Sequence, residues 1–292
     1  YVLSEGVIAA FPSLWDREAR INQAVAALSE AKAHGVSTIV DLTVLGLGRD
    51  ASLAREVSRQ SGVNVVVATG LYTYDELPHY FNLRDIDHMA GLFVRDIEHG
   101  VQDTDVRAGI LKVATDEKGM TPGVEKVVRA VARAHRRTGA PISTHTHAAT
   151  QRGLDQQRVF TEEGVDLSRV VIGHSGDTED IAYLEKLMAA GSYIGMDRFG
   201  IDSFMPTDKR VAVIATLCER GHTDKIVLSH DASCYIDWFP EEMPKQVMPR
   251  WHFLHISDEV VPALLTAGVS EDQIRAMTID NPRRIFETQG AY

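Results

Sequence analysis

The chain has 292 residues and 44% of them are hydrophobic, which is enough apolar material for a buried core and too much for a disordered chain. Its 30 Lys and Arg residues are outnumbered by 41 Asp and Glu residues, so the net charge is −11 and nucleic-acid binding through phosphate neutralisation is not expected. No apolar run reaches the roughly 20 residues of a membrane span, and Cys218 and Cys234 form no CxxC pattern. We therefore expect a cytoplasmic protein without a membrane partner.

Short β-branched runs alternate along the chain with longer segments of helical period. This alternation is typical of parallel strands joined by crossover helices. We predict seven strands, over Thr38–Leu42, Asn64–Thr69, Ala108–Lys112, Pro141–His145, Val170–His174, Tyr193–Asp197 and Lys225–Asp231.

Two of the intervening helices have clear signals. The segment Arg17–His34 has one apolar face, and Gly35 can end that helix. Thr121 suits the N-cap of another helix, with Pro122 at the first helical position. The faces expected to pack on a sheet are Ile21, Ala24, Val25 and Leu28 in the first helix and Val124, Val127, Val128 and Val131 in the second.

No Pro- or Ser-rich linker, composition shift or low-complexity stretch divides the chain, so we predict a single domain over residues 1–292. Seven strand–helix units fit either an open doubly wound sheet or an eight-stranded (β/α)8 TIM barrel with its first strand missing from this sequence. The chain begins with Tyr1 rather than Met, so a segment upstream is expected. The residues that could carry chemistry decide between the two folds.

Four predicted strands end in side chains that can bind metal or move protons: Lys112, His145, His174 and Asp231. In a parallel barrel all strand C-termini open on one face, so these four side chains would converge. Each has a plain structural alternative, since a strand-end His is often a buried core residue and Asp231 could be a helix cap. His147 lies beyond its strand and is the weaker candidate for a ligand.

A lysine at the end of the apolar run Gly109–Leu111 is costly to bury as a cation. With a lowered pKa its amine can add carbon dioxide, and the resulting carbamate can bridge two divalent metals held by His nitrogens and an Asp oxygen. Two metals that share a hydroxide are suited to hydrolysis, and the Asp can carry the proton to the leaving group.

The sequence resembles the phosphotriesterase family of the amidohydrolase superfamily, and most closely its phosphotriesterase-like lactonases. The similarity covers essentially the whole chain. It is carried by residues Thr38–Thr43, Leu45–Asp50, Ala68–Tyr72, Ile142–His145, Val171–His174, Gly195–Arg198 and Leu228–Asp231. By this resemblance Lys112 matches the carboxylated bridging lysine, His145 and His174 match two ligands of one metal, and Asp231 matches a ligand of the other metal that also shuttles the proton.

Three features favour the lactonase branch within this resemblance. Tyr72 follows its strand where the lactonases place a tyrosine beside the metals, and Arg198 follows the sixth predicted strand. The loop after Asp231 is long and apolar, so that Trp238 and its neighbours could receive an acyl chain or could simply pack on the barrel. The apolar residues of this loop are Tyr235, Trp238, Phe239, Met243, Met248 and Trp251.

The family's first strand ends in a His-x-His pair that supplies two further ligands, and this pair is not in the sequence. By the resemblance it would lie just before Tyr1. We expect a missing segment rather than a lost function, because the other ligand candidates keep their strand-end contexts.

The leading hypothesis is a binuclear metal hydrolase that opens N-acyl homoserine lactones or other aliphatic lactones, with phosphotriester hydrolysis as a side activity. Asp231 and Tyr72 would be its catalytic residues, and Tyr72, Arg198 and Trp238 would contact the substrate. Zinc is the expected metal, although cobalt, manganese and iron suit the same ligands. The resemblance also implies a homodimer.

Three alternatives stay open. The main substrate could be an organophosphate, or the protein could be an inactive binding protein. Residues Gly46–Ala51 also match the dinucleotide fingerprint G-x-G-x-x-A, but the next strand ends without the acidic residue that would hold a ribose.

Overall fold

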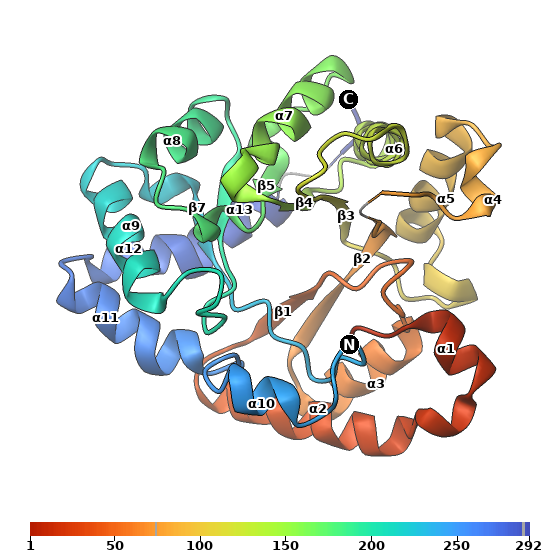
Figure 1. Ribbon diagram of the computed structural model, residues 1–292, viewed down its shortest axis with the longest axis horizontal. Coiled ribbons are helices and arrows are strands. Elements are labelled where there is room, and N and C mark those ends of the chain that lie inside the picture. The colour runs from red at the N-terminus through yellow and green to blue at the C-terminus, as the bar shows by residue number, and fades with distance from the viewer. Residues whose placement is uncertain (74, 288–289) are drawn as a thin grey trace.

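The computed structural model describes residues 1–73, 75–287 and 290–292. Within these residues seven parallel strands form one curled sheet, in which each strand pairs with the next in chain order (Figure 1). The strands are β1 (Thr38–Asp41), β2 (Asn64–Leu71), β3 (Ile110–Thr115), β4 (Ile142–Thr146), β5 (Val170–Ile172), β6 (Tyr193–Met196) and β7 (Ile226–Leu228).

Helices lie around the outside of the sheet (Figure 1). They are α1 (Glu5–Ala10), α2 (Arg17–Ala33), α3 (Ala51–Ser61), α4 (His79–Asn82), α5 (Ile86–Glu98), α6 (Pro122–Thr138), α7 (Arg152–Glu162), α8 (Ile181–Ala189), α9 (Thr207–Glu219), α10 (Met243–Val247), α11 (Val261–Thr266), α12 (Glu271–Arg275) and α13 (Asn281–Glu287). Two π-helical turns, Ile256–Val260 and Ala276–Asp280, lead into α11 and α13. In the described part of the chain no helix is long and apolar enough to cross a membrane.

The order of the strands decides between the two predicted folds. A doubly wound sheet reverses its strand order at a switch point, whereas β1 to β7 follow one another without reversal. The predicted TIM-barrel class is confirmed, with seven of its eight strands within the described residues. These residues include no ladder between β1 and β7; instead Val2 forms a bridge with Ile236 and Leu3 N donates to Leu47 O at 2.9 Å.

The seven predicted strands exist, but four of their C-terminal ends were wrong by two or three residues. β2 continues to Leu71 instead of ending at Thr69. β3 continues to Thr115, so Lys112 lies inside the strand rather than at its end. β5 and β7 end at Ile172 and Leu228, and His174 (φ 57°) and Asp231 (φ 56°) beyond them have left-handed backbones that cannot be part of a strand. Hydrophobic periodicity carries no information on this change of backbone conformation.

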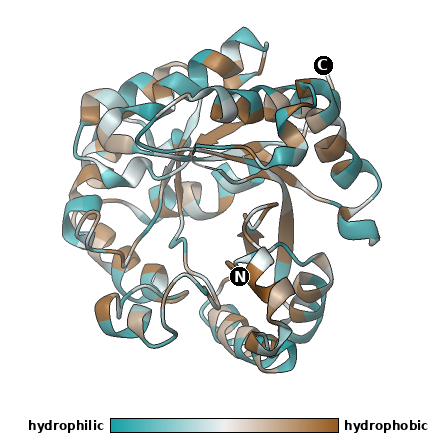
Figure 2. Cartoon of the chain, turned by 45° about the vertical axis from the view of Figure 1, so that its right-hand side comes forward, coloured by the Kyte–Doolittle hydropathy of each residue, from teal (hydrophilic) through white to brown (hydrophobic). Residues whose placement is uncertain are grey.

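Both predicted helix signals are confirmed. Gly35 has φ +92° just after the C-cap of α2, and the Thr121 side chain accepts a hydrogen bond from Val124 N at the start of α6. The four valines of the α6 face are buried in the main core. Of the four α2 residues, Ile21, Ala24 and Leu28 are buried and Val25 is half-buried. Figure 2 shows the hydrophobic colour along the strands, with the surrounding helices alternating between hydrophobic and hydrophilic faces.

The loop with the dinucleotide-like glycines is filled from within the chain. The backbone N–H groups of Gly46 and Gly48 both donate to the Glu5 carboxylate, at 3.3 and 3.0 Å. A Cβ at Gly48 would lie only 2.4 Å from Cβ of Leu3. The turn therefore holds a carboxylate of its own chain where a dinucleotide would place its pyrophosphate, which argues against the dinucleotide hypothesis.

Gly70 of β2 provides a test of how closely the strands approach. It pairs with Lys112 and has φ +141°, and a Cβ there would lie 1.9 Å from Lys112 O. Gly70→Ala should lower the free energy of unfolding by at least about 2 kcal/mol. Gly91→Ala in α5, where nothing lies within 4 Å of a new Cβ, should leave stability unchanged or raise it by about 0.5–1 kcal/mol. Urea unfolding of both variants checks this, and equal losses would contradict the close approach.

Candidate active site

One cavity of about 400 Å³ lies among the C-terminal ends of the strands and extends towards α2 and α3, where Leu28 and Leu53 line it. Its lining includes every site residue predicted from the sequence: Tyr72, Lys112, His145, His174, Arg198, Trp238 and Asp231. The topology thus brings together side chains that six different strands and their following loops supply. The roles assigned to these residues remain predictions, but their common location is a property of the fold.

Three of these residues share an unusual backbone. His174, Arg198 and Asp231 follow β5, β6 and β7, and each has φ between 56° and 59°. A left-handed conformation costs roughly 1–2 kcal/mol for a residue other than glycine, and such strain clusters at functional sites. The repeated geometry turns the chain sharply at the end of three adjacent strands.

His145 and His174 form a pair of neutral imidazoles. Their rings are nearly perpendicular, with centroids 4.5 Å apart, and burial lowers the pKa of His145 to about 3 and that of His174 well below its ordinary value. His174 Nδ1 donates to Asp197 Oδ1 at 2.7 Å, while its Nε2 makes no hydrogen bond to a described residue. Nε2 of His174 therefore presents a lone pair.

Two oxygen groups flank the ring of His145. The Tyr72 hydroxyl lies 3.2 Å from His145 Nδ1, and an Asp116 oxygen lies 4.0 Å from His145 Nε2. Asp116 follows β3 in the loop after Thr115, and the sequence reasoning did not select it. It places a carboxylate on the side of the imidazole opposite Tyr72.

Lys112 is a buried amine in the wall of the cavity. Its side chain is 5% exposed, and burial lowers the pKa of its amine to about 8 against the opposing effect of Asp231 and Asp197. About a tenth of such amines are neutral at pH 7. A neutral amine is the form that reacts with carbon dioxide, so the environment favours the predicted carbamate.

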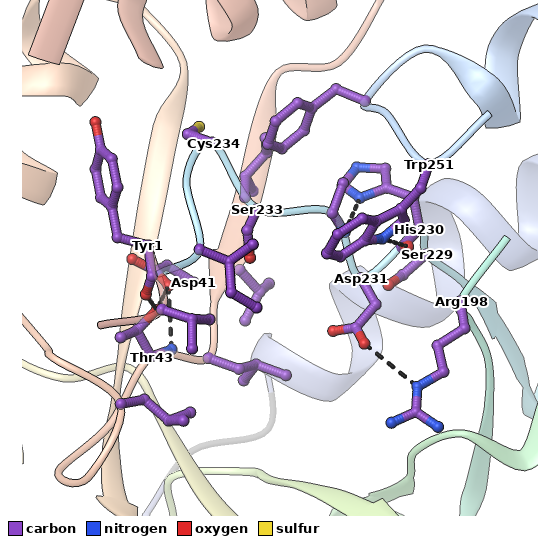
Figure 3. A pocket seen from close by; sticks show the side chains of 18 of the residues that line it. Tyr1, Asp41, Thr43, Arg198, Ser229, His230, Asp231, Ser233, Cys234 and Trp251 are labelled. Carbon is purple, nitrogen blue, oxygen red and sulfur yellow. Dashed lines mark hydrogen bonds and ion pairs between the residues drawn. The ribbon is translucent and has the colours of Figure 1, made fainter. Parts of the chain in front are cut away.

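An alternating row of charges runs from Asp231 into the protein. Arg198 Nε lies 3.5 Å from Asp231 Oδ2, as Figure 3 shows, and Arg198 Nη1 lies 2.8 Å from Asp177. Asp177 also binds Arg210 at 2.7 Å. Arg210 is fully buried and donates to the backbone oxygens of Asp197 and Met205 at 2.9 and 3.0 Å. The row fixes the orientation of Arg198 beside the carboxylate.

Asp177, Asp197 and Arg210 were not selected from the sequence. Asp177 lies three residues after His174, and Asp197 follows the last residue of β6. Their positions beside strand ends were a usable signal. Arg210 lies within α9, where nothing in the pattern distinguishes it from a solvent-exposed basic residue.

The apolar residues of the long loop after Asp231 fall into two groups. Some line the cavity, where they could contact an acyl chain, and others pack elsewhere on the protein or lie at its surface. The residues that line the cavity are Trp238, Phe239, Met248 and Trp251. Tyr235 instead packs against Trp15 with ring centroids 5.9 Å apart and lies under Arg20, and Met243 of α10 is 39% exposed on the surface. Most of the aromatic surface therefore belongs to the cavity.

The donor types fit a metal site in part. Across the described residues no three His, Cys, Asp or Glu side chains are grouped so as to hold a metal ion. Neutral imidazoles at His145 and His174, a half-exposed carboxylate at Asp231 and the reactive amine of Lys112 are nevertheless the groups that bind divalent cations, directly or as a carbamate. These four residues are the ones that could hold a metal.

Comparisons with known proteins show the family to which the chain is similar. The model of the phosphotriesterase family matches residues 2–286. The chain is 57% identical over 300 residues to a phosphotriesterase homology protein of Mycobacterium tuberculosis, covering 100% of this chain and 92% of the relative. It is 45% identical over 288 residues to an aryldialkylphosphatase of Saccharolobus solfataricus, covering 98% and 91%.

The fold is similar to a solved structure of the phosphotriesterase from Mycobacterium tuberculosis. The TM-score is 0.97 at 57% sequence identity, and the match covers 100% of this chain and 93% of the other. A similarity of this extent includes the strands, the helices and the loops that form the cavity.

The buried imidazoles predict how stability depends on pH. Burial lowers the pKa of His145 to about 3 and of His230 to about 4, and it lowers that of His174 as well. The unfolded chain binds protons at these positions near pH 6.5 and the folded chain does not. The neutral imidazoles therefore contribute fully to the free energy of unfolding above about pH 6.5. This contribution is lost as the pH falls towards their pKa values in the folded chain, by about 1.4 kcal/mol per pH unit for each imidazole.

Urea unfolding between pH 7.5 and 5.5, with a chelator present, measures this slope. His145→Asn should reduce the slope of the free energy of unfolding against pH by the part that one imidazole contributes. His99→Asn, which replaces a histidine with a 73% exposed side chain, should leave the slope unchanged. A stability that is independent of pH over this range would contradict the neutral, buried state of the imidazoles.

Proposed function

The chain belongs to the phosphotriesterase family, and on this premise we propose that it is a metal-dependent hydrolase whose main reaction is the opening of lactone rings. Family membership makes it a hydrolase that acts on small molecules. The choice of N-acyl homoserine lactones or other aliphatic lactones, with phosphotriesters as secondary substrates, is our proposal.

One observation supports a lactone with an apolar chain. Trp238, Phe239, Met248 and Trp251 line the same cavity as the polar cluster around Lys112. An aliphatic lactone has a polar ring to match the cluster and a hydrocarbon chain to match the aromatic wall. Burial of that chain would supply binding energy of about 25 cal/mol per Å² of apolar surface.

We propose that two divalent ions, zinc first among the candidates, bind at this cluster. His145 and His174 would hold one ion, Asp231 would be a ligand of the other, and carboxylated Lys112 would join them. When bound, such a pair supplies Lewis acidity and an activated water. The neutral state of both imidazoles supports this assignment, because only an unprotonated nitrogen can be a ligand.

The chain's own residues would then divide the remaining work. Asp231 is 45% exposed towards the cavity, and it would accept the proton of the attacking water and pass it to the ring oxygen. Arg198, held by Asp177, would keep the Asp231 carboxylate in place and draw substrate oxygens towards it. The Tyr72 hydroxyl would position the lactone carbonyl beside His145, and Trp238 would contact the acyl chain.

Three further expectations stay predictions: a single domain over residues 1–292, a homodimer, and a cytoplasmic location. The organophosphate alternative has support in the names of two relatives, a phosphotriesterase homology protein and an aryldialkylphosphatase. No observation of the described residues favours an inactive binding protein. Activity measurements separate these possibilities.

The substrate class is tested by comparing kcat/KM for a long-chain acyl lactone with that for an aryl phosphotriester. We expect the lactone to be preferred. Asp231→Asn should lower kcat for either substrate about 10²- to 10⁴-fold, because proton transfer is lost. Asp208→Asn, at an exposed position of α9, should leave it unchanged. A clear preference for the phosphotriester would contradict the lactonase proposal, and absence of turnover with added divalent metals would favour the binding protein.

The carbamate of Lys112 is tested by ¹³C NMR after equilibration with ¹³C-labelled bicarbonate. A carbamate resonance should appear in the wild-type protein near pH 8, where the amine is about half neutral. It should be absent in Lys112→Met and present in Lys245→Met, which removes an exposed lysine. A resonance of equal intensity in Lys112→Met would show that other amines carry it.

A further inference from the structure

Two loops supply aromatic and other apolar side chains to one part of the cavity wall. One follows β6 and spans residues 197–206, and the other follows β7 and spans residues 229–253. The first contributes Arg198, Ile201 and Phe204, and the second contributes Trp238, Phe239, Met248 and Trp251. Both loops therefore border the part of the cavity that contains these aromatic side chains.

The two loops touch at the level of the backbone. Gly200 has φ +93°, and a Cβ there would lie 2.2 Å from Arg250 O and 2.8 Å from Trp251 Cα. Glycine is required at this position both for its conformation and for the close approach. The contact places the start of one loop directly against the end of the other.

Beside this contact a single carboxylate joins three segments. Asp202 forms an ion pair with Arg250, and its other oxygen lies 3.2 Å from both the backbone N–H and the hydroxyl of Thr207 at the start of α9. The Thr207 hydroxyl in turn lies 3.1 Å from Nε2 of buried His255. Arg250 also lies 3.6 Å from Glu259. The loop after β7 is thereby fixed to the N-terminus of α9.

The ion pair is connected to the candidate catalytic carboxylate through the chain. Trp251 follows Arg250, and its indole N–H donates to His230 O at 3.2 Å (Figure 3). His230 is the residue before Asp231. On the other loop Phe204 lies under the Arg198 guanidinium, 4.5 Å from the ring centre. Each loop thus contacts a residue beside or within the Asp231–Arg198 pair.

We propose that Asp202 and Arg250 form a latch that sets the width of the acyl-binding part of the cavity and so determines chain-length specificity. Neither side chain lines the cavity, so both are positioning residues that act through Trp251 and the loop after β6. The latch itself is an inference from geometry, whereas its effect on acyl chains rests on the proposed function.

The kinetic test uses Arg250→Gln, Asp202→Asn and the exchange D202R/R250D with a series of aliphatic lactones that differ only in chain length. In the single variants KM for the longest chain should rise about two- to five-fold, the range of a partly exposed ion pair, while kcat for the shortest lactone stays unchanged. The exchange variant should recover part of the loss. Lys245→Gln, which removes the ion pair between α10 and its N-cap residue Glu242, is the matched control and should change neither parameter.

Hydrogen exchange of the backbone amides in residues 232–253 tests the latch without any substrate. Exchange in this loop should become faster in Arg250→Gln and Asp202→Asn and stay unchanged in Lys245→Gln. This measurement decides on the latch even when lactones are not hydrolysed, so the two proposals can fail separately. Unchanged loop exchange in both latch variants would overturn the latch, as would a KM increase that is equal for short and long chains.

Discussion

The site depends on one constraint, the burial of an amine inside a parallel sheet. Lys112 lies within β3 and is 5% exposed, and desolvation disfavours its charged form. The charges of Asp231 and Asp197 offset this cost in part. Removal of either carboxylate would further disfavour the charged form of the amine. The polar cluster and the fold are therefore mutually dependent.

An unusual backbone surrounds the same cavity. His174, Arg198 and Asp231 lie two or three residues beyond the ends of β5, β6 and β7, and all three have left-handed backbones. On the other side Gly70 lets β2 approach Lys112 O more closely than any side chain would permit. Buried Arg210 then joins α9 to the segments after β5 and β6 through Asp177 and the Asp197 backbone. Charged hydrogen bonds thus connect the segments that contain the three left-handed residues.

Much of this arrangement could be predicted from the sequence, because ionisable residues at the ends of apolar runs are conspicuous. Lys112, His145, His174 and Asp231 were found in this way, and parallel topology implied their convergence. Strand ends were placed wrongly where His174 and Asp231 change backbone conformation, since side-chain pattern does not encode φ.

Two ion pairs between distant segments had no signal in the sequence. Arg210 and Asp177 are 33 residues apart, and Asp202 and Arg250 are 48 residues apart. Both pairs consist of residue types that usually lie on the surface. Only the folded chain shows that the first pair is buried and that the second joins two loops of the cavity wall.

The central claim is that the side chains at these strand ends bind metal, and metal analysis of the purified protein tests it most directly. Dialysis against zinc followed by elemental analysis should give about two ions per chain, as a two-metal site requires. The double variant His145→Asn/His174→Asn, if its circular dichroism shows a retained fold, should lose at least one of them. Equal metal content in the two proteins, or none in either, would contradict the account.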